Sequence, residues 1–108
     1  MAIEMMNTRI ETLESFVAGD PDDSFSRYAL ALEFVKAGRE EDATLHFKEV
    51  LARDSTYVAA YYQLGGLLAK SGHVDEARDV YRRGLEAATG AADQRTRSEI
   101  QEALEALD

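Results

Sequence analysis

Two stretches placed 34 residues apart decide the fold of this chain: RYALALEFVKAGREEDATLHF (residues 27–47) and YYQLGGLLAKSGHVDEARDVY (residues 61–81). When residues 24–57 are laid over residues 58–91, six positions are identical. The identical pairs are Tyr28 with Tyr62, Leu30 with Leu64, Lys36 with Lys70, Gly38 with Gly72, Ala43 with Ala77 and Leu51 with Leu85. Phe34 with Leu68 and Phe47 with Tyr81 also keep their apolar character. The chain therefore contains an internal repeat with a period of 34 residues.

Each repeat has the pattern of two helices joined by a short turn. In the first repeat, Leu30, Ala31 and Phe34 form an apolar stripe at helical spacing. Gly38 then ends the helix, because glycine takes the left-handed conformation without steric cost. Acidic residues 40–42 follow, and their negative charges interact favourably with the positive N-terminal end of the next helix. We predict that the buried face of this second helix consists of Ala43, Phe47, Val50 and Leu51. The second repeat follows the same scheme, and its corresponding residues are Leu64, Gly65, Leu68, Gly72, Asp75, Glu76, Ala77, Tyr81 and Leu85.

This period and pattern resemble the tetratricopeptide repeat, whose motif is W-x2-L-G-x2-Y followed by A-x3-F and a late proline. Residues 61–68 with Ala77-x3-Tyr81 match it well. Residues 27–34 depart from it, since Arg27 stands in the tryptophan position, and Ser55 and Thr89 stand where the late prolines belong. The resemblance implies an all-α fold: an α-solenoid of helical hairpins in a right-handed superhelix, with about six antiparallel helices.

The rest of the chain is assigned around these two repeats, residues 24–57 and 58–91, to make one domain over residues 1–108. Residues 1–20 resemble the second helix of an earlier repeat, because Leu13, Phe16 and Val17 align with Phe47, Val50 and Leu51 and Pro21 takes the late-proline position. The apolar stripe of that helix is Ile3, Met6, Ile10, Leu13 and Val17. Residues 92–108 are expected to form a capping helix with Ile100, Ala103, Leu104 and Leu107 on one face.

Composition and charge exclude several classes of partner. The net charge is −9, from 21 acidic and 12 basic residues, which disfavours nucleic acids and anionic membranes. The chain has no cysteine, no N-terminal signal pattern and no apolar run long enough to span a bilayer, so a cytoplasmic location is expected. Arginine outnumbers lysine nine to three. Such an acidic, lysine-poor surface is typical of proteins from a high-salt cytoplasm, where salt screens the repulsion between the acids, and it also occurs in ordinary acidic bacterial proteins.

No pattern in the sequence indicates catalysis. His46 and His73 lie at no metal-binding spacing, and both are expected on the surface. No nucleophile has a base nearby in a known motif, and Gly65 and Gly66 lie within a helix rather than in a phosphate-binding loop. We therefore expect no catalytic residues, no metal, no cofactor and no enzymatic activity.

The resemblance implies a binding surface instead, since in this family the first helix of each hairpin lines a concave groove. The residues it places there, by steps of about four along each helix, are Tyr28, Leu32, Lys36, Tyr62, Gln63, Gly66 and Lys70. Each also has a purely structural interpretation. The tyrosines can pack between helices, the lysines can offset the helix dipole, and Gly66 can serve close helix packing rather than a gap in the groove floor.

The family's clamp for chaperone C-terminal tails is absent, because Tyr28, Leu32 and Gln63 stand at its lysine and asparagine positions. Two functions remain. The first is an adaptor that binds a peptide or partner protein in the groove. The second is a structural module that self-associates through exposed helix ends, with Ile3, Met5 or Met6 at the contact. We expect a monomer or a weak homo-oligomer.

Overall fold

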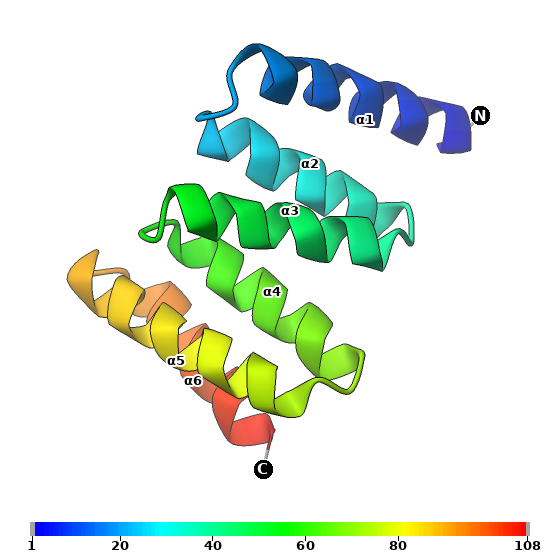
Figure 1. The fold of residues 1–108 in the computed structure, drawn as a ribbon. Helices are drawn as coiled ribbons and strands as arrows, with labels where there is room; N and C mark the ends of the chain where they lie inside the picture. The colour runs from blue at the N-terminus through cyan, green and yellow to red at the C-terminus, as the bar shows by residue number, and fades with distance from the viewer. Residues whose placement is uncertain (1, 108) are drawn as a thin grey trace. The chain divides into compact units, whose positions relative to one another are not determined.

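The computed structural model describes residues 2–107, and they form six α-helices without a β-strand in that range (Figure 1). The helices are α1 (Ala2–Gly19), α2 (Ser24–Lys36), α3 (Glu40–Arg53), α4 (Val58–Lys70), α5 (Val74–Gly90) and α6 (Gln94–Ala106). This confirms the predicted all-α fold. The side chains of Ile3 and Met6, which the sequence places in the apolar stripe of α1, lie outside the part that the structure describes.

The chain divides into two compact units, residues 1–53 and residues 54–108. In the first unit α2 packs against both α1 and α3, and neighbouring helices run antiparallel (Figure 1). In the second unit α5 packs against α4 and α6, and α4 also contacts α6. Each unit therefore contains one complete helical hairpin, α2 with α3 or α4 with α5, and one additional helix that packs against it.

Glycine ends the first helix of both hairpins, as the sequence predicts. Gly38 and Gly72 have φ angles of 76° and 87°, in the left-handed region that favours glycine. The amide of the following residue then donates to a carbonyl five residues back: Arg39 to Phe34 and His73 to Leu68, both at 2.8 Å. After α5 the same bond joins Asp93 to Ala88 at 2.9 Å, but Ala92 takes the left-handed φ of 56°. The third turn thus has the geometry of the other two without their glycine.

Acidic side chains begin the helices in two ways. Asp23 caps α2 by accepting bonds from the hydroxyl (2.6 Å) and the amide (3.1 Å) of Ser26, and these bonds lower the pKa of Asp23. Asp93 caps α6 by accepting from the amide of Thr96 at 3.0 Å, which lowers the pKa of Asp93. The helices α3 and α5 instead carry acids within their first turns, where a negative charge interacts favourably with the helix dipole.

The aromatic residues predicted at the centre of each hairpin are buried. Phe47 is 0% exposed and Tyr81 is 4% exposed. The prediction is less accurate for Leu85, which is only half-buried. The buried residue on that side of α5 is Gly84, where an added Cβ would lie 2.6 Å from Tyr61 Cβ and 3.0 Å from Ile100 Cδ1. Because α4 and α6 both approach this glycine closely, no space remains for a side chain there.

On α1 the predicted stripe is partly correct. Ile10 and Val17 are buried, whereas Leu13 is half-buried. Phe16 aligns with the fully buried Val50, yet Phe16 is 57% exposed. On α6, Ile100 is buried while Ala103, Leu104 and Leu107 are half-buried. The outer helices of the two units therefore bury their apolar faces less completely than the hairpins do.

Arg27 stands at the tryptophan position of the repeat motif, and it has the same structural role as the aromatic residue at that position in the second hairpin. Its guanidinium is buried, and Nη2 donates to the carbonyl of Pro21 at 3.1 Å. The equivalent residue of the second hairpin, Tyr61, is also buried, and its hydroxyl donates to the carbonyl of Ser55 at 2.7 Å. Both side chains thus reach a carbonyl six residues earlier, in the loop before their own helix.

The burial of Phe47 leads to a stability prediction with a control on the same helix. Phe47→Ala should lower the free energy of unfolding by about 3–5 kcal/mol, because it removes a fully buried ring and leaves a cavity. Leu45 is 66% exposed on α3, so Leu45→Ala should change stability by less than about 0.5 kcal/mol. Urea denaturation followed by circular dichroism measures both. A loss of less than 1 kcal/mol for Phe47→Ala would contradict the assigned core.

Candidate functional site

The exposed side of α2 combines apolar side chains with one lysine. Helical spacing places Phe25, Tyr28, Leu32 and Lys36 toward one side of the helix. Phe25 is 72% exposed, Tyr28 and Leu32 are half-buried, and Lys36 is exposed. We call these four residues the α2 face. Three of them are apolar or aromatic, on a chain in which nearly a third of all residues are charged.

Tyr28 connects the α2 face to the core of the first unit. Its ring centroid lies 5.6 Å from that of Phe47, with the two planes at 59°. This tilted contact is a favourable geometry for two aromatic rings. Tyr28 is therefore held in place by a buried residue of α3 while part of its side chain stays accessible.

Lys36 shares a carboxylate with a residue of α1. Its Nζ lies 3.4 Å from Glu33 Oε1, and Arg9 Nε lies 3.4 Å from Glu33 Oε2. Glu33 is nearly buried, whereas the side chains of Lys36 and Arg9 are more than half exposed. Two cations thus accompany one anion at this end of α2. The chain as a whole has a net charge of −9.

Phe25 is the residue of this face that the repeat alignment did not identify. Its counterpart in the second repeat is Ala59, so the alignment shows no shared aromatic character there. Helical periodicity alone could have placed Phe25 on this face, because Phe25 lies seven residues, or two turns, before Leu32.

The corresponding side of α4 carries smaller residues. Tyr62 and Gln63 are half-buried, and Gly66 and Lys70 are exposed. Ala59 and Ala69 are half-buried. We call Tyr62, Gln63, Gly66, Ala69 and Lys70 the α4 face. Where the α2 face presents Leu32, the α4 face presents a glycine.

Gly65 and Gly66 are adjacent in α4, but their surroundings differ. A Cβ on Gly65 would lie 2.2 Å from Tyr81 Cε1, so the ring of Tyr81 packs directly on the backbone of α4 at this point. A Cβ on Gly66 would meet only Tyr81 Oη, at the ordinary contact distance of 3.9 Å. Close helix packing therefore explains Gly65 and does not explain Gly66.

His46 is less exposed than the sequence analysis expects. Its ring stacks on Phe34, with centroids 5.2 Å apart, and its Nδ1 is buried without a hydrogen-bond partner among the described residues. Burial, followed by the positive charge of Arg27, lowers the pKa of His46. The prediction of a surface position is therefore only partly correct for His46, which is half-buried because the turn before α3 brings α2 and α3 close enough for the ring to pack on Phe34. His73 is exposed, as expected.

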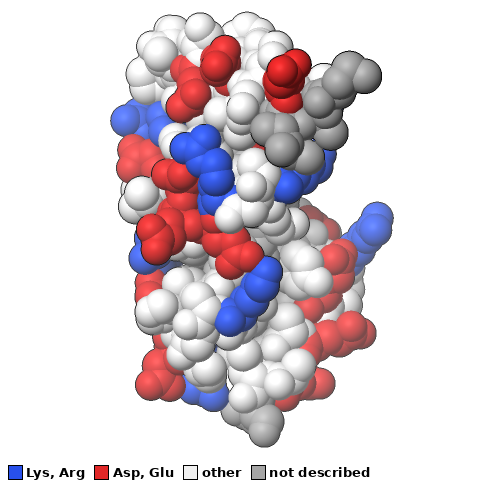
Figure 2. Space-filling view, turned by 90° about the vertical axis from the view of Figure 1, so that its right-hand side faces the viewer, with Lys and Arg blue, Asp and Glu red and all other residues white. Residues whose placement is uncertain are grey.

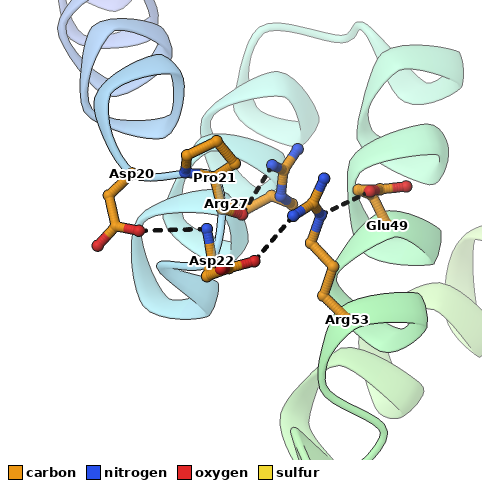
Figure 3. A network of polar contacts seen from close by, with 6 residues as sticks. All are labelled: Asp20, Pro21, Asp22, Arg27, Glu49 and Arg53. Atoms are coloured by element: carbon orange, nitrogen blue, oxygen red, sulfur yellow. Dashed lines mark hydrogen bonds and ion pairs between the residues drawn. The ribbon is translucent and has the colours of Figure 1, made fainter.

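A polar network joins the loop between α1 and α2 to α3 (Figure 3). Arg53 donates from Nη1 to Asp22 at 2.9 Å and from Nε to Glu49 at 2.7 Å. The bond to Arg53 lowers the pKa of Glu49, and the same pairing raises the pKa of Arg53. These side chains are substantially exposed, so each ion pair stabilises the fold only slightly. The network orders the loop, next to the buried bond from Arg27 to Pro21.

Positive and negative side chains are mixed on one side of the molecule. On the side of the molecule drawn in Figure 2, acidic side chains lie among uncharged residues, with lysine and arginine side chains interspersed.

Among the described residues, no group of three or more His, Asp or Glu side chains is arranged to hold a metal ion. None of the helices in residues 2–107 is both long enough and apolar enough to cross a bilayer.

Comparison with known proteins matches most of this chain to one family of repeat proteins. The family model described as tetratricopeptide repeat matches residues 4–89. A tetratricopeptide-repeat-containing protein of Pseudomonas aeruginosa is 29% identical over 99 residues, which are 92% of this chain and 94% of that protein. The DnaJ homolog subfamily C member 3 of Mus musculus is 31% identical over 85 residues, or 79% of this chain. The match spans only 17% of the mouse protein.

Solved structures agree with this result. The crystal structure of a tetratricopeptide-repeat domain protein from Salinibacter ruber has a TM-score of 0.76 and 38% identity, covering 79% of this chain and 94% of that one. PcrH, solved in complex with the chaperone-binding region of PopD, has a TM-score of 0.88 over 96% of this chain and 79% of its own. Its identity is 14%, so this second likeness concerns the fold alone.

The two glycines of α4 should respond in opposite ways to alanine. Gly65→Ala should destabilise the protein by about 1–3 kcal/mol, because the new methyl group collides with the ring of Tyr81. Gly66→Ala should stabilise it by about 0.5–1 kcal/mol, because the helix interior prefers alanine and the site has space for a methyl group. Thermal and urea denaturation of both variants measure the difference. Equal effects of the two substitutions would contradict the described packing.

Proposed function

Because the chain belongs to the tetratricopeptide-repeat family, we propose that it binds a peptide or partner protein, and the candidate binding surfaces are the α2 face of the first unit and, separately, the α4 face of the second. The family's fold serves as a protein–protein interaction module. The structure of PcrH with the chaperone-binding region of PopD is an example of a protein with this fold that holds a segment of another polypeptide. This supports the kind of partner that we propose and does not specify its identity.

The observation that carries the proposal is the exposed phenyl ring of Phe25 on the α2 face. A single exposed apolar residue is ordinary on a protein surface. Here, however, Phe25 continues into Leu32 and Tyr28 on the same side of the helix, and the strip ends at Lys36. Apolar strips with a polar border are typical of protein-binding sites, and aromatic residues commonly supply most of the binding energy.

The charges beside this strip favour an acidic partner segment. Lys36 and Arg9 share the carboxylate of Glu33, so this cluster holds two positive charges and one negative charge. A ligand with aliphatic or aromatic side chains and a nearby acidic group complements both properties. The charge would orient the ligand and speed its association, while the apolar contacts would provide affinity.

A substitution at Phe25 tests this function. We would select 12-residue peptides from a phage-displayed random library on the wild-type protein and measure their dissociation constants by fluorescence anisotropy. Phe25→Ala should weaken binding by more than about tenfold, because aromatic anchors contribute more than about 1–2 kcal/mol. Its melting temperature should stay unchanged, since the ring is exposed.

Leu45→Ala is the matched control, because Leu45 is similarly exposed in the same unit but lies on α3. It should bind the peptides as the wild type does. If no peptide is selected, or if the two variants bind with equal affinity, the α2 face is not the binding surface.

A second candidate function is self-association, and one observation favours it. Met5 is 63% exposed and Phe16 is 57% exposed, and their separation of about three helical turns places them on the same side of α1. Within the first unit, α2 packs on another side of α1, which contains the buried residues Ile10 and Val17. A second copy of the chain would bury these two apolar side chains.

Sedimentation distinguishes this candidate from a monomeric adaptor. If α1 mediates association, the weight-average mass should rise with concentration, and Phe16→Ala combined with Met5→Ala should abolish the rise without unfolding the chain. The variant Phe25→Ala should leave association intact, because Phe25 belongs to the α2 face. A mass that stays monomeric up to millimolar concentration would exclude self-association as the function.

A further inference from the structure

Tyr81 extends from α5 across the backbone of α4 toward the α4 face. Its ring atoms Cε1, Cδ1 and Cζ would lie 2.2, 2.6 and 2.7 Å from a Cβ on Gly65, so the ring occupies the space that a side chain would take there. Its hydroxyl lies farther along, 3.9 Å from the Cβ position of Gly66. The residue is 4% exposed, whereas Gly66 is exposed. The buried ring thus ends in a hydroxyl beneath an exposed glycine.

Among the described residues, the buried side-chain atoms without a hydrogen-bond partner are Arg27 Nε, Glu33 Oε2 and His46 Nδ1, so Tyr81 Oη is not a buried, unsatisfied group. Burial, followed by the nearby phenol of Tyr62, raises the pKa of Tyr81. The phenol is therefore neutral at pH 7 and keeps its proton for donation. A neutral tyrosine hydroxyl can donate one hydrogen bond, to solvent or to a bound ligand.

Gly66 has no packing reason to be a glycine. Glycine destabilises a helix interior relative to alanine, and the space at Gly66 would accept a methyl group without a clash. Apart from the adjacent residues and the nearby backbone of α4 itself, the one described atom within 4 Å of that methyl group would be Tyr81 Oη. The missing side chain therefore has one structural consequence, which is that Tyr81 Oη stays uncovered on the α4 face.

The neighbouring residues allow a polypeptide to come close at this point. Ala69 follows Gly66 on the same side of α4 and presents only a methyl group. Tyr62 and the amide of Gln63 lie on the same part of the helix and supply further hydrogen-bonding groups. Small residues of this kind let a ligand's main chain approach more closely than the larger side chains of the α2 face would.

We propose that Tyr81 donates a hydrogen bond from Oη, over Gly66, to an oxygen acceptor of the bound polypeptide. The acceptor is either a main-chain carbonyl or a C-terminal carboxylate, which share the same chemistry. This inference rests on the proposed function, since it assigns a donor within the α4 face to the same polypeptide ligand. It adds to that face a residue of α5, the second helix of the hairpin.

Two substitutions test the inference without removing the packing of the ring. Tyr81→Phe deletes only the hydroxyl and should weaken binding of the library-selected peptides by about two- to tenfold, the usual effect of one hydrogen bond. Gly66→Ala should weaken binding at least as much, because the methyl group covers Oη and keeps the peptide at a distance. Both variants should retain the helical spectrum of the wild type, and Gly66→Ala should melt at a higher temperature. Val74→Ala, an exposed position at the start of α5, is the control and should leave binding unchanged.

A direct readout comes from the tyrosine itself. In protein labelled with ¹³C at tyrosine Cζ, the Tyr81 signal is identified by its loss in Tyr81→Phe. Peptide binding should shift this signal in the wild type, and the shift should be absent in Gly66→Ala. Synthetic peptides with a free C-terminal acid and with a C-terminal amide separate the two acceptors. Equal shifts identify a main-chain carbonyl, and a shift with the acid alone identifies the carboxylate.

The outcomes separate this inference from the proposed function. If peptides bind, Phe25→Ala weakens them and Tyr81→Phe does not, the α2 face binds the ligand and Tyr81 is only a core residue. If the Tyr81 signal does not move on binding, the inference is overturned in the same way. If no peptide binds the wild-type protein, the proposed function and this inference fail together.

Discussion

The second unit depends on the contact between the ring of Tyr81 and the bare backbone of Gly65. The helices α4 and α5 can approach closely only because residue 65 has no side chain, and the ring fills the space between them. The opposite arrangement occurs at Gly84, where α5 supplies the glycine and α4 supplies Tyr61. Each helix therefore contributes one aromatic ring and one glycine. This reciprocal packing sets the spacing of the hairpin, and Ile100 of α6 then packs against the same part of α5.

The first unit reaches a similar hairpin with different residues. Phe47 is fully buried at the position that Tyr81 takes in the second hairpin, and it also contacts the ring of Tyr28. Arg27 replaces the aromatic residue of the motif, yet it reaches the loop carbonyl of Pro21 as Tyr61 reaches that of Ser55. What the two hairpins share at this position is a buried donor that satisfies a loop carbonyl. A long side chain with a hydrogen-bonding tip meets that requirement whether it is aromatic or cationic.

These packing differences produce two different faces. The α2 face presents Phe25 and Leu32 beside Lys36, so it offers apolar area and a positive charge. The α4 face presents Gly66 and Ala69, with the hydroxyl of a core tyrosine close beneath. In the proposed function, the α2 face would contact ligand side chains and the α4 face would contact a ligand main chain. In the proposed binding mode, Tyr81 links core packing to ligand recognition, because its ring packs within the hairpin and its hydroxyl lies beneath Gly66 of the α4 face.

The sequence by itself determined the class of fold, the period and the approximate ends of the helices. Those properties depend on local chemistry: apolar spacing, a glycine in the left-handed region at Gly38 and Gly72, and acids at helix starts. It also identified Phe47 and Tyr81 as core residues, because both lie at the centre of an apolar stripe. The turn at Ala92 could not be located in the same way, since its left-handed residue is not a glycine.

Only the tertiary structure decided how far each residue is buried and which partner it meets. Helical periodicity gives the side of a helix, but the distance to the neighbouring helix determines whether that side is filled. For this reason Leu85 is half-buried while Gly84 is buried, and His46 packs on Phe34. The same reason separates Gly65 from Gly66, which look alike in the sequence. Tyr81 of α5 lies 16 residues after Gly65 in the chain, so the sequence does not show that they meet. In the structure the ring of Tyr81 packs on the backbone at Gly65, and its hydroxyl lies beneath Gly66.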